Sequence, residues 1–229
     1  MRADGIIFDK DGTLFEFRAT WEAWAARMLA DAAQGDTALE ARLADAIRFD
    51  RKVQAFHPDS PCIAGTNREV AELVCAVLGE DDIEGMELRL IISAQDVPLV
   101  EAVPLAAFLD GLAARGLRLG VVTNDSEAGA TGHLGQTRIL ERFDFVAGFD
   151  SGHGAKPAPG PLLAFAAQLG LDPAHVVMVG DSTHDLIAGR RAGMQTVGVL
   201  TGIAEAPELE PHADVILPHI GHIPGLLAP

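Results

Sequence analysis

The chain has 229 residues, of which 48% are hydrophobic, and a formal net charge of −16. This length fits one large domain or a core domain with a smaller one, and the composition argues against a disordered or low-complexity chain. The negative charge argues against nucleic acid and anionic membranes as partners, and the sequence contains no apolar run of about 18 residues that predicts a membrane span.

The expected compartment is the cytoplasm. The first residues lack the basic and then apolar layout of a signal peptide. Cys62 and Cys75 show neither a CxxC pattern nor zinc-ligand spacing, so we expect free thiols, as is usual in a reducing compartment. The acidic composition fits a soluble surface and requires no special partner, so a monomer and a homodimer both remain open.

The N-terminal apolar run Gly5-Ile6-Ile7-Phe8 predicts a short buried strand that ends in two carboxylates, Asp9 and Asp11. Because side chains alternate along a strand, we expect Asp9 and Asp11 on one face and Lys10 on the other, with Gly12 turning the chain. Two like charges at one place repel unless a cation or a shared proton lies between them. The pair therefore indicates a metal site, an acid/base pair or a carboxylate nucleophile; a turn with two solvated aspartates is the alternative.

Residues 18–92 are expected to be mainly helical. A helix that begins near Asp36 or Thr37 is predicted by apolar residues at helical spacing, namely Leu39, Leu43, Ile47 and Phe49. Thr66 and Glu69 form a capping-box pattern before a further helix, and Gly79 is expected to end that helix.

After Pro98, predicted strands alternate with predicted helices. The strands lie at 117–123, 145–149, 176–180, 195–200 and 213–217, and the helices at 105–112, 161–169 and 185–192. Such alternation predicts parallel strands in a doubly wound α/β sheet. Since the helical segment separates the first strand from the others, we expect a core domain of residues 1–16 and 96–229 with an inserted helical subdomain of residues 17–95.

Polar residues follow the expected strands at their carboxyl ends, where open α/β sheets bind ligands. They are Asp9, Asp11, Thr123, Asn124, Asp181 and Asp185, with Lys156 between the strands at 145–149 and 176–180. This set suits phosphoryl transfer. Lys156 supplies positive charge to a phosphate, and Thr123 and Asn124 supply hydrogen-bond donors.

The carboxylates have expected roles in the same reaction. Asp9, Asp181 and Asp185 can hold Mg²⁺, a hard cation that prefers oxygen ligands. The cation would let a carboxylate approach an anionic phosphate. Asp9 could then attack phosphorus to form an aspartyl phosphate, while Asp11 protonates the leaving oxygen and later deprotonates the attacking water.

Four short motifs, in order along the chain, resemble those of the haloacid dehalogenase superfamily, specifically its phosphoglycolate phosphatase-like branch with a helical cap. They are Asp9-Lys10-Asp11-Gly12-Thr13, Val122-Thr123-Asn124, Lys156-Pro157 and Gly180-Asp181-Ser182-Thr183-His184-Asp185. The resemblance implies a Rossmann-like parallel-sheet core with an inserted α-helical cap, Asp9 as nucleophile, Asp11 as acid/base and Mg²⁺ as cofactor. It also implies that Asp11 ligates the metal through its backbone carbonyl.

The chain departs from this branch at Phe15-Glu16-Phe17, the entry to the expected cap, where members often continue with Val-Asp-Ser. Substrate choice is therefore less transferable than the chemistry. Gly65-Thr66-Asn67-Arg68 resembles a cap specificity loop of related enzymes, so Arg68 is the first candidate for contact with the non-phosphate end of a substrate; a solvated helix face is the alternative. Asp11 separates the chain from the dehalogenases themselves, which lack this second acid.

The sequence thus predicts a Mg²⁺-dependent phosphatase that hydrolyses a small phosphorylated metabolite, a phosphomonoester such as phosphoglycolate or a sugar phosphate, through an aspartyl phosphate. A phosphomutase of the same fold, similar to β-phosphoglucomutase, is one alternative. A non-catalytic protein that binds phosphate or Mg²⁺ is another. The intact set of Asp9, Asp11, Thr123, Lys156 and Asp181 argues against the latter, because a pure binder has little need for both Asp9 and Asp11.

Overall fold

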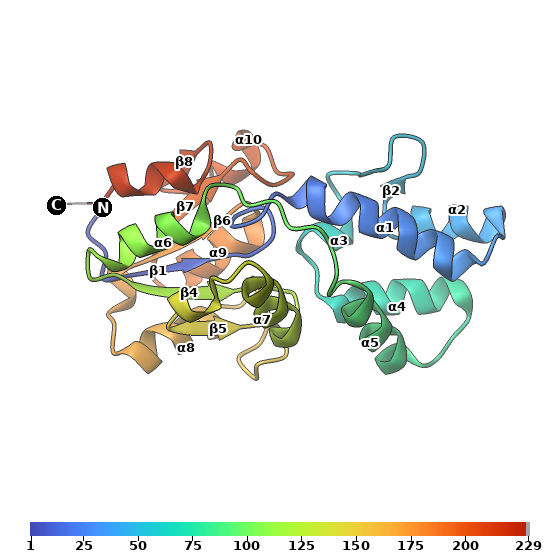
Figure 1. Ribbon diagram of the computed structural model, residues 1–229, viewed down its shortest axis with the longest axis horizontal. Coiled ribbons are helices and arrows are strands. Elements are labelled where there is room, and N and C mark those ends of the chain that lie inside the picture. Colours follow the sequence, from blue (N-terminus) through green and yellow to red (C-terminus); the bar gives the residue numbers. More distant parts are fainter. Residues whose placement is uncertain (228–229) are drawn as a thin grey trace. The chain divides into compact units, whose positions relative to one another are not determined.

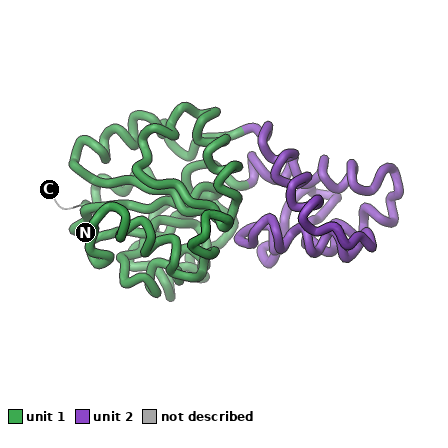
Figure 2. The backbone as a smooth tube through the Cα atoms, turned by 90° about the horizontal axis from the view of Figure 1, so that it is seen from below, with its two compact units in different colours: residues 1–17, 99–229 green, residues 18–98 purple. Residues whose placement is uncertain are grey.

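The computed structural model describes residues 1–227 and divides into two compact units (Figure 2). Met1–Phe17 and the described residues from Leu99 onward form unit 1, and Arg18–Pro98 form unit 2. Unit 1 is therefore assembled from two stretches of chain that unit 2 separates in sequence.

Unit 1 is built on a six-stranded sheet (Figure 1). Its strands are β1 (Gly5–Phe8), β4 (Arg118–Val122), β5 (Phe145–Ala147), β6 (Val176–Gly180), β7 (Gln195–Val199) and β8 (Val215–Leu217). They lie in the order β5-β4-β1-β6-β7-β8, so β1 is hydrogen-bonded to β4 on one side and to β6 on the other. All neighbouring strands pair in parallel, which confirms the predicted α/β class.

Helices alternate with these strands along the chain, as a parallel sheet requires. They are α6 (Leu105–Ala113), α7 (Glu127–Gln136), α8 (Gly160–Leu169), α9 (Thr183–Arg191) and the short α10 (Ala206–Leu209). Three 3₁₀ segments occupy Leu140–Arg142, Pro173–His175 and Ile220–Gly225. Within the described residues, no helix has both the length and the apolar character needed to cross a membrane.

The side chains of β1 contribute to two apolar cores. Ile6 and Phe8 belong to one core together with Leu109 of α6, and Ile7 belongs to the other together with Phe165 of α8. All five side chains are fully buried. A strand covered by helices on both faces must be apolar at successive positions, which explains the continuous apolar run of β1.

Unit 2 is mainly helical, with α1 (Phe17–Ala33), α2 (Thr37–Ala46), α3 (Pro61–Ala64), α4 (Asn67–Leu78) and α5 (Ile83–Ser93). Thr66 caps α4, and both hydrogen bonds of the predicted capping box with Glu69 are present. Gly79 ends α4 in the left-handed conformation, with φ of 72°. Cys62 and Cys75 are free thiols, as predicted.

Phe49 does not continue a helix, contrary to the sequence prediction. α2 ends at Ala46, and Arg48 has a φ of 54°, in the left-handed region that a helix does not tolerate. The chain then forms an antiparallel hairpin of β2 (Phe49–Asp50) and β3 (Ala55–Phe56), in which Phe49 pairs with Phe56. The two rings pack edge to face, with 5.1 Å between their centroids. The apolar spacing could not reveal this turn, because a helix and a hairpin both bury Phe49.

Candidate active site

The carboxyl ends of β4, β1 and β6 lie side by side, and predicted site residues follow them directly. The parallel register aligns the last residues of β1 with those of β4 and β6. Asp9, Thr123 and Asp181 come immediately after these three strands. The strand order therefore brings together residues that are far apart in sequence, at the edge of the sheet where open α/β folds bind ligands.

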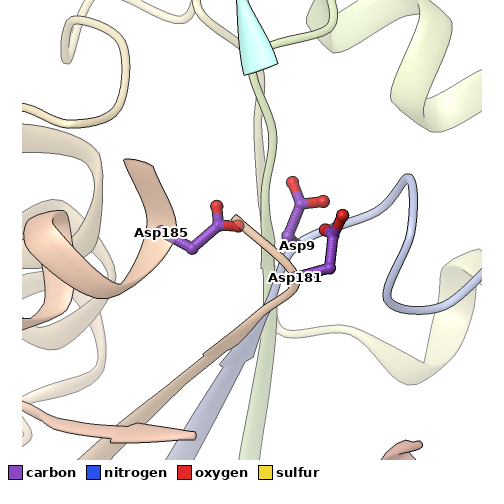
Figure 3. A group of neighbouring side chains, drawn as sticks. All are labelled: Asp9, Asp181 and Asp185. Carbon is purple, nitrogen blue, oxygen red and sulfur yellow. The ribbon is translucent and has the colours of Figure 1, made fainter. Parts of the chain in front are cut away.

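Three carboxylates gather at this edge, those of Asp9, Asp181 and Asp185. Each offers an oxygen, and these oxygens lie within 4.8 Å of one another. Figure 3 shows Asp185 directed from α9 toward Asp9 and Asp181. All three residues are buried. The structure thus places the side chains of three of the four predicted metal ligands in one group.

Burial changes the ionisation of these carboxylates. It raises the pKa of Asp9 to about 7, against the opposing charge of Lys156. Burial also raises the pKa of Asp181 well above its usual range, and the charges of Asp9 and Asp185 raise it further. With all three carboxylates ionised, as a bound cation would require, they and the Lys156 ammonium carry −3 and +1, a formal charge of −2. Oxygen donors with this uncompensated charge fit a hard divalent cation.

Lys156 is the cation within this group. Its ammonium donates to Oδ1 of Asp9 at 2.5 Å, to Oδ1 of Asp185 at 2.6 Å and to the carbonyl of Val122 at 2.8 Å. Burial acts to lower the pKa of Lys156, but the carboxylates of Asp185 and Asp9 outweigh burial and raise it. The lysine therefore stays charged and holds two of the carboxylates in place.

Hydrogen bonds at the start of α9 also hold Asp185 in place. Its Oδ2 accepts the backbone N–H of Ser182 at 3.0 Å and the Ser182 hydroxyl at 2.7 Å, in the capping box of α9. One carboxylate thus caps a helix with one oxygen and meets Lys156 with the other. The first turn of α9 therefore sets the position of Lys156 as well.

The predicted phosphate-binding residues after β4 organise their own loop. The amide of Asn124 donates to the Lys156 carbonyl and accepts the Lys156 N–H, both at 2.9 Å. Its side chain therefore fixes the segment that carries Lys156, and contact between Asn124 and a phosphate stays a prediction. The Thr123 hydroxyl accepts the N–H of Asp125 at 3.1 Å, and such a hydroxyl can still donate to a ligand.

Asp11 pairs with Lys10, which corrects the predicted alternation. β1 ends at Phe8, so the alternation of strand side chains does not extend to Asp11. Oδ2 of Asp11 lies 2.5 Å from Nζ of the fully buried Lys10. Asp9 and Asp11 are therefore close in sequence but contact different lysines.

Gly12 turns the chain directly beside Asp181. Its φ is 87°, and a Cβ at this position would lie 2.7 Å from Oδ1 of Asp181. The Thr13 hydroxyl donates to the same oxygen at 3.4 Å, and the Thr201 hydroxyl donates to the Gly12 carbonyl at 2.5 Å. The turn requires glycine both for its conformation and for the space that Asp181 occupies.

Arg68 belongs to unit 2, where its guanidinium lies 3.3 Å from Glu87 and 3.5 Å from Glu72. Its side chain is 42% exposed despite these ion pairs. Contact between Arg68 and a substrate stays a prediction.

Sequence reasoning missed the partners of Lys10. Its Nζ also lies 3.2 Å from Oδ2 of Asp125 and 2.9 Å from Nδ1 of His133. Burial acts to lower the pKa of Lys10, but Asp11 and Asp125 outweigh burial and raise it. Lys10 directly follows the predicted buried strand, and a buried ammonium needs acceptors, so this position was the signal that acceptors lie near Lys10. His133 gave no such signal, since its partner Lys10 is 123 positions away in sequence.

The chain is similar in sequence to a known family of proteins. A family model described as haloacid dehalogenase-like hydrolase matches residues 3–193. Over 90 residues, 39% of the chain, the sequence is 42% identical to phosphoglycolate phosphatase of Neisseria meningitidis. The aligned part spans 38% of that protein's length.

Two further likenesses extend over nearly the whole chain. The sequence is 30% identical over 226 residues to N-acetylmuramic acid 6-phosphate phosphatase of Pseudomonas putida, covering 96% of this chain and 93% of that protein. The crystal structure of a predicted phosphoglycolate phosphatase from Haemophilus somnus superposes with a TM-score of 0.72, covering 99% of this chain and 98% of the other. At 22% identity, the latter likeness shows the shared fold.

Proposed function

The chain belongs to the haloacid dehalogenase-like hydrolase family, and on that premise we propose that it is a Mg²⁺-dependent phosphatase of small organic phosphomonoesters, such as phosphoglycolate or a sugar phosphate. The observation that carries the proposal is the buried Asp9, which contacts Lys156 and lies beside two further carboxylates at the end of β1. The names of the relatives, phosphoglycolate phosphatase and N-acetylmuramic acid 6-phosphate phosphatase, support this class of substrate.

In the first step Asp9 is the nucleophile. A carboxylate oxygen of Asp9 forms a bond to phosphorus while the bond from phosphorus to the ester oxygen breaks, which produces an aspartyl phosphate. The departing oxygen takes a proton from Asp11 and leaves as an alcohol. Lys156 holds Oδ1 of Asp9 at 2.5 Å and so orients the carboxylate for attack.

In the second step water releases the phosphate. The water oxygen bonds to phosphorus as the bond between phosphorus and Asp9 breaks, and Asp11 accepts the proton that the water loses. Inorganic phosphate leaves, Asp9 is again a carboxylate and Asp11 is again protonated. The Thr123 hydroxyl and the charge of Lys156 bind the phosphate through both steps.

Mg²⁺ fits the buried carboxylates on charge and donor type. We assign its binding to Asp9, Asp181 and Asp185, with the backbone carbonyl of Asp11 as a further oxygen ligand. When bound, the ion supplies positive charge that offsets the repulsion between the Asp9 carboxylate and the phosphate.

Unit 2 has the proposed role of a cap that selects the substrate. Arg68 is the residue of unit 2 that we assign to the non-phosphate end of the ester. Its exposed guanidinium supports this assignment, because it can take on a further polar partner besides Glu87 and Glu72.

The test of this proposal is Asp9→Asn, which keeps the shape of the side chain and removes the nucleophile. We expect hydrolysis of p-nitrophenyl phosphate to fall by about 10⁴-fold or more, with an unchanged circular dichroism spectrum. Excess EDTA should abolish wild-type activity, and added Mg²⁺ should restore it. Asp96→Asn, at an exposed position of unit 2, is the matched control and should retain full activity.

Full activity of Asp9→Asn, or of the wild type in EDTA, would overturn the proposal. The same assay separates the alternatives. Release of phosphate without an added sugar bisphosphate supports a phosphatase, whereas a requirement for the bisphosphate indicates a phosphomutase. Binding of Mg²⁺ or phosphate without turnover of any ester indicates a non-catalytic binding protein.

A further inference from the structure

Lys10 is fully buried and contacts three acceptors. Its ammonium lies 2.5 Å from Oδ2 of Asp11, 2.9 Å from Nδ1 of His133 and 3.2 Å from Oδ2 of Asp125. We refer to these four residues as the Lys10 cluster. Its members come from the turn after β1, from the loop after β4 and from α7, so the cluster joins three parts of unit 1.

The contacts determine how His133 takes part. An ammonium has three donors and no lone pair, so Nδ1 of His133 must be the acceptor and the ring proton lies on Nε2. The three donors of Lys10 thus face at least three acceptors at hydrogen-bonding or ion-pairing distance. This arrangement compensates a charge whose burial without partners would be costly, and it leaves the ammonium little freedom to move.

The two oxygens of Asp11 differ in their surroundings. Oδ2 faces Lys10, whereas Oδ1 is buried and has no hydrogen-bond partner among residues 1–227. Buried polar atoms without a partner are rare, and each needs an explanation. A partner that is present only while a substrate is bound would explain this oxygen.

Asp125 connects the Lys10 cluster to the loop that we assign to phosphate binding. Its Oδ1 accepts the N–H of Ser126 at 2.7 Å, and its own N–H donates to the Thr123 hydroxyl at 3.1 Å. Asp125, which pairs with Lys10, and the hydroxyl of Thr123 are therefore held in a single turn at the end of β4. A shift of Lys10 relative to Asp125 would move Asp11 relative to the bound phosphate.

We propose that Lys10 is a positioning residue that holds Oδ2 of Asp11 and thereby directs Oδ1 toward the leaving oxygen of the substrate. Asp125 and His133 hold Lys10 in turn. The proton moves from Oδ1 to the ester oxygen as the bond from phosphorus to that oxygen breaks, and Lys10 keeps its three protons. This inference rests on the proposed function, in which Asp11 protonates the leaving group.

The test compares two esters in the full-length Lys10→Met variant. p-Nitrophenyl phosphate has a leaving group that departs with little help from an acid, whereas phenyl phosphate needs more. Without the ammonium the Asp11 carboxylate can rotate, so we expect kcat/KM for phenyl phosphate to fall about 10- to 100-fold more than for p-nitrophenyl phosphate. This ratio reports the step in which the leaving group departs, and a general loss of structure would not change it.

Two controls accompany this measurement. In an Asp11→Asn background, Lys10→Met should leave the ratio unchanged, because the acid is already absent. Lys52→Met, at an exposed position in the turn between β2 and β3, is the matched lysine control and should also leave the ratio unchanged. Equal losses with both esters, or the same change of ratio without Asp11, would overturn the inference.

His133 provides the decisive variants if Lys10→Met does not fold. His133→Leu removes one acceptor of Lys10 and should change the ratio in the same direction, whereas His133→Asn keeps an acceptor and should not. An unchanged ratio in His133→Leu would overturn the inference. Asp9→Asn tests the phosphatase proposal separately: if it is inactive while Lys10→Met affects both esters equally, only the role of Lys10 fails.

Discussion

Two aspartates that are close in sequence, Asp9 and Asp11, contact different buried lysines. Lys156 contacts Asp9, and Lys10 contacts Asp11. Each ammonium also contacts at least one further carboxylate. Each set of one lysine and its carboxylates therefore keeps a net negative charge, which a cation or a proton can neutralise. In the proposed mechanism, the nucleophile Asp9 and the acid Asp11 are therefore held by separate lysines.

Asp214 makes a contribution to stability that depends on pH. Its carboxylate pairs with Arg190 at 2.7 Å and accepts the N–H of Thr196 at 2.8 Å. Burial acts to raise the pKa of Asp214, but these contacts outweigh burial and lower it. Because the folded pKa lies below the unfolded one, the contribution is complete above the unfolded pKa and is lost as the pH falls through the folded pKa.

We expect Asp214→Asn to lower the free energy of unfolding by about 1 kcal/mol at neutral pH, since the carboxylate is partly exposed. The difference from the wild type should shrink as the pH falls below 3.8, the ordinary pKa of an aspartate, and should vanish once the pH is below the lowered pKa of folded Asp214. Urea unfolding at a series of pH values measures this difference, with the exposed Asp96→Asn as control. A difference that stays constant under acidic conditions would contradict the prediction.

At the scale of elements, α7 carries His133, a partner of Lys10, although the helix is rich in residues that form helices poorly. It contains Gly129, Gly132 and Gly135, which lower its intrinsic propensity. A Cβ at Gly129 would lie 2.7 Å from Oδ2 of Asp125, whereas a Cβ at Gly132 or Gly135 would meet no atom within 4 Å. Of the three glycines, Gly129 is therefore the one that the packing requires, because it admits the carboxylate that holds Lys10.

This difference predicts opposite effects of one substitution at two positions. Gly132→Ala should raise the free energy of unfolding by about 0.5–1 kcal/mol, because alanine restricts the unfolded chain and fits the helix. Gly129→Ala should lower it, because the methyl group displaces the Asp125 carboxylate. Urea unfolding of both variants measures the contrast. Equal stabilisation by the two substitutions would show that Asp125 has room to move.

At the scale of the whole molecule, unit 1 contains the candidate carboxylates and both buried lysines, whereas Arg68 lies in unit 2. The chain as a whole is strongly acidic, yet the site holds two buried lysines close to its carboxylates. A cation that binds this folded arrangement and not the unfolded chain must stabilise the fold by mass action.

We therefore expect Mg²⁺ to raise the melting temperature. At a concentration about 100 times Kd the stabilisation is about 2.7 kcal/mol, which corresponds to about 5–10 °C for a chain of this size. Differential scanning calorimetry with Mg²⁺ and with EDTA measures the shift. Asp181→Asn should lose most of it, and an equal shift in that variant would place the ion elsewhere.

Local patterns predicted many of the elements because the forces behind them act within a few residues. The capping box of Thr66 and the left-handed Gly79 depend on neighbours within about one turn of α4. The hairpin at Phe49 could not be predicted in the same way. Its strands are two residues long, and the pairing of Phe49 with Phe56 depends on a turn that has no strong sequence signal.

By itself, the sequence determined the α/β class and predicted the candidate carboxylates just after strands and Lys156 in a loop between two strands, because these assignments follow from apolar runs and the polar residues after them. The tertiary structure decided which lysine serves which carboxylate. Lys156 reaches Asp9 across 147 positions, and Lys10 reaches His133 across 123. These pairings depend on the order β4-β1-β6 and on the packing of α7, and no local pattern encodes the partner of a buried charge.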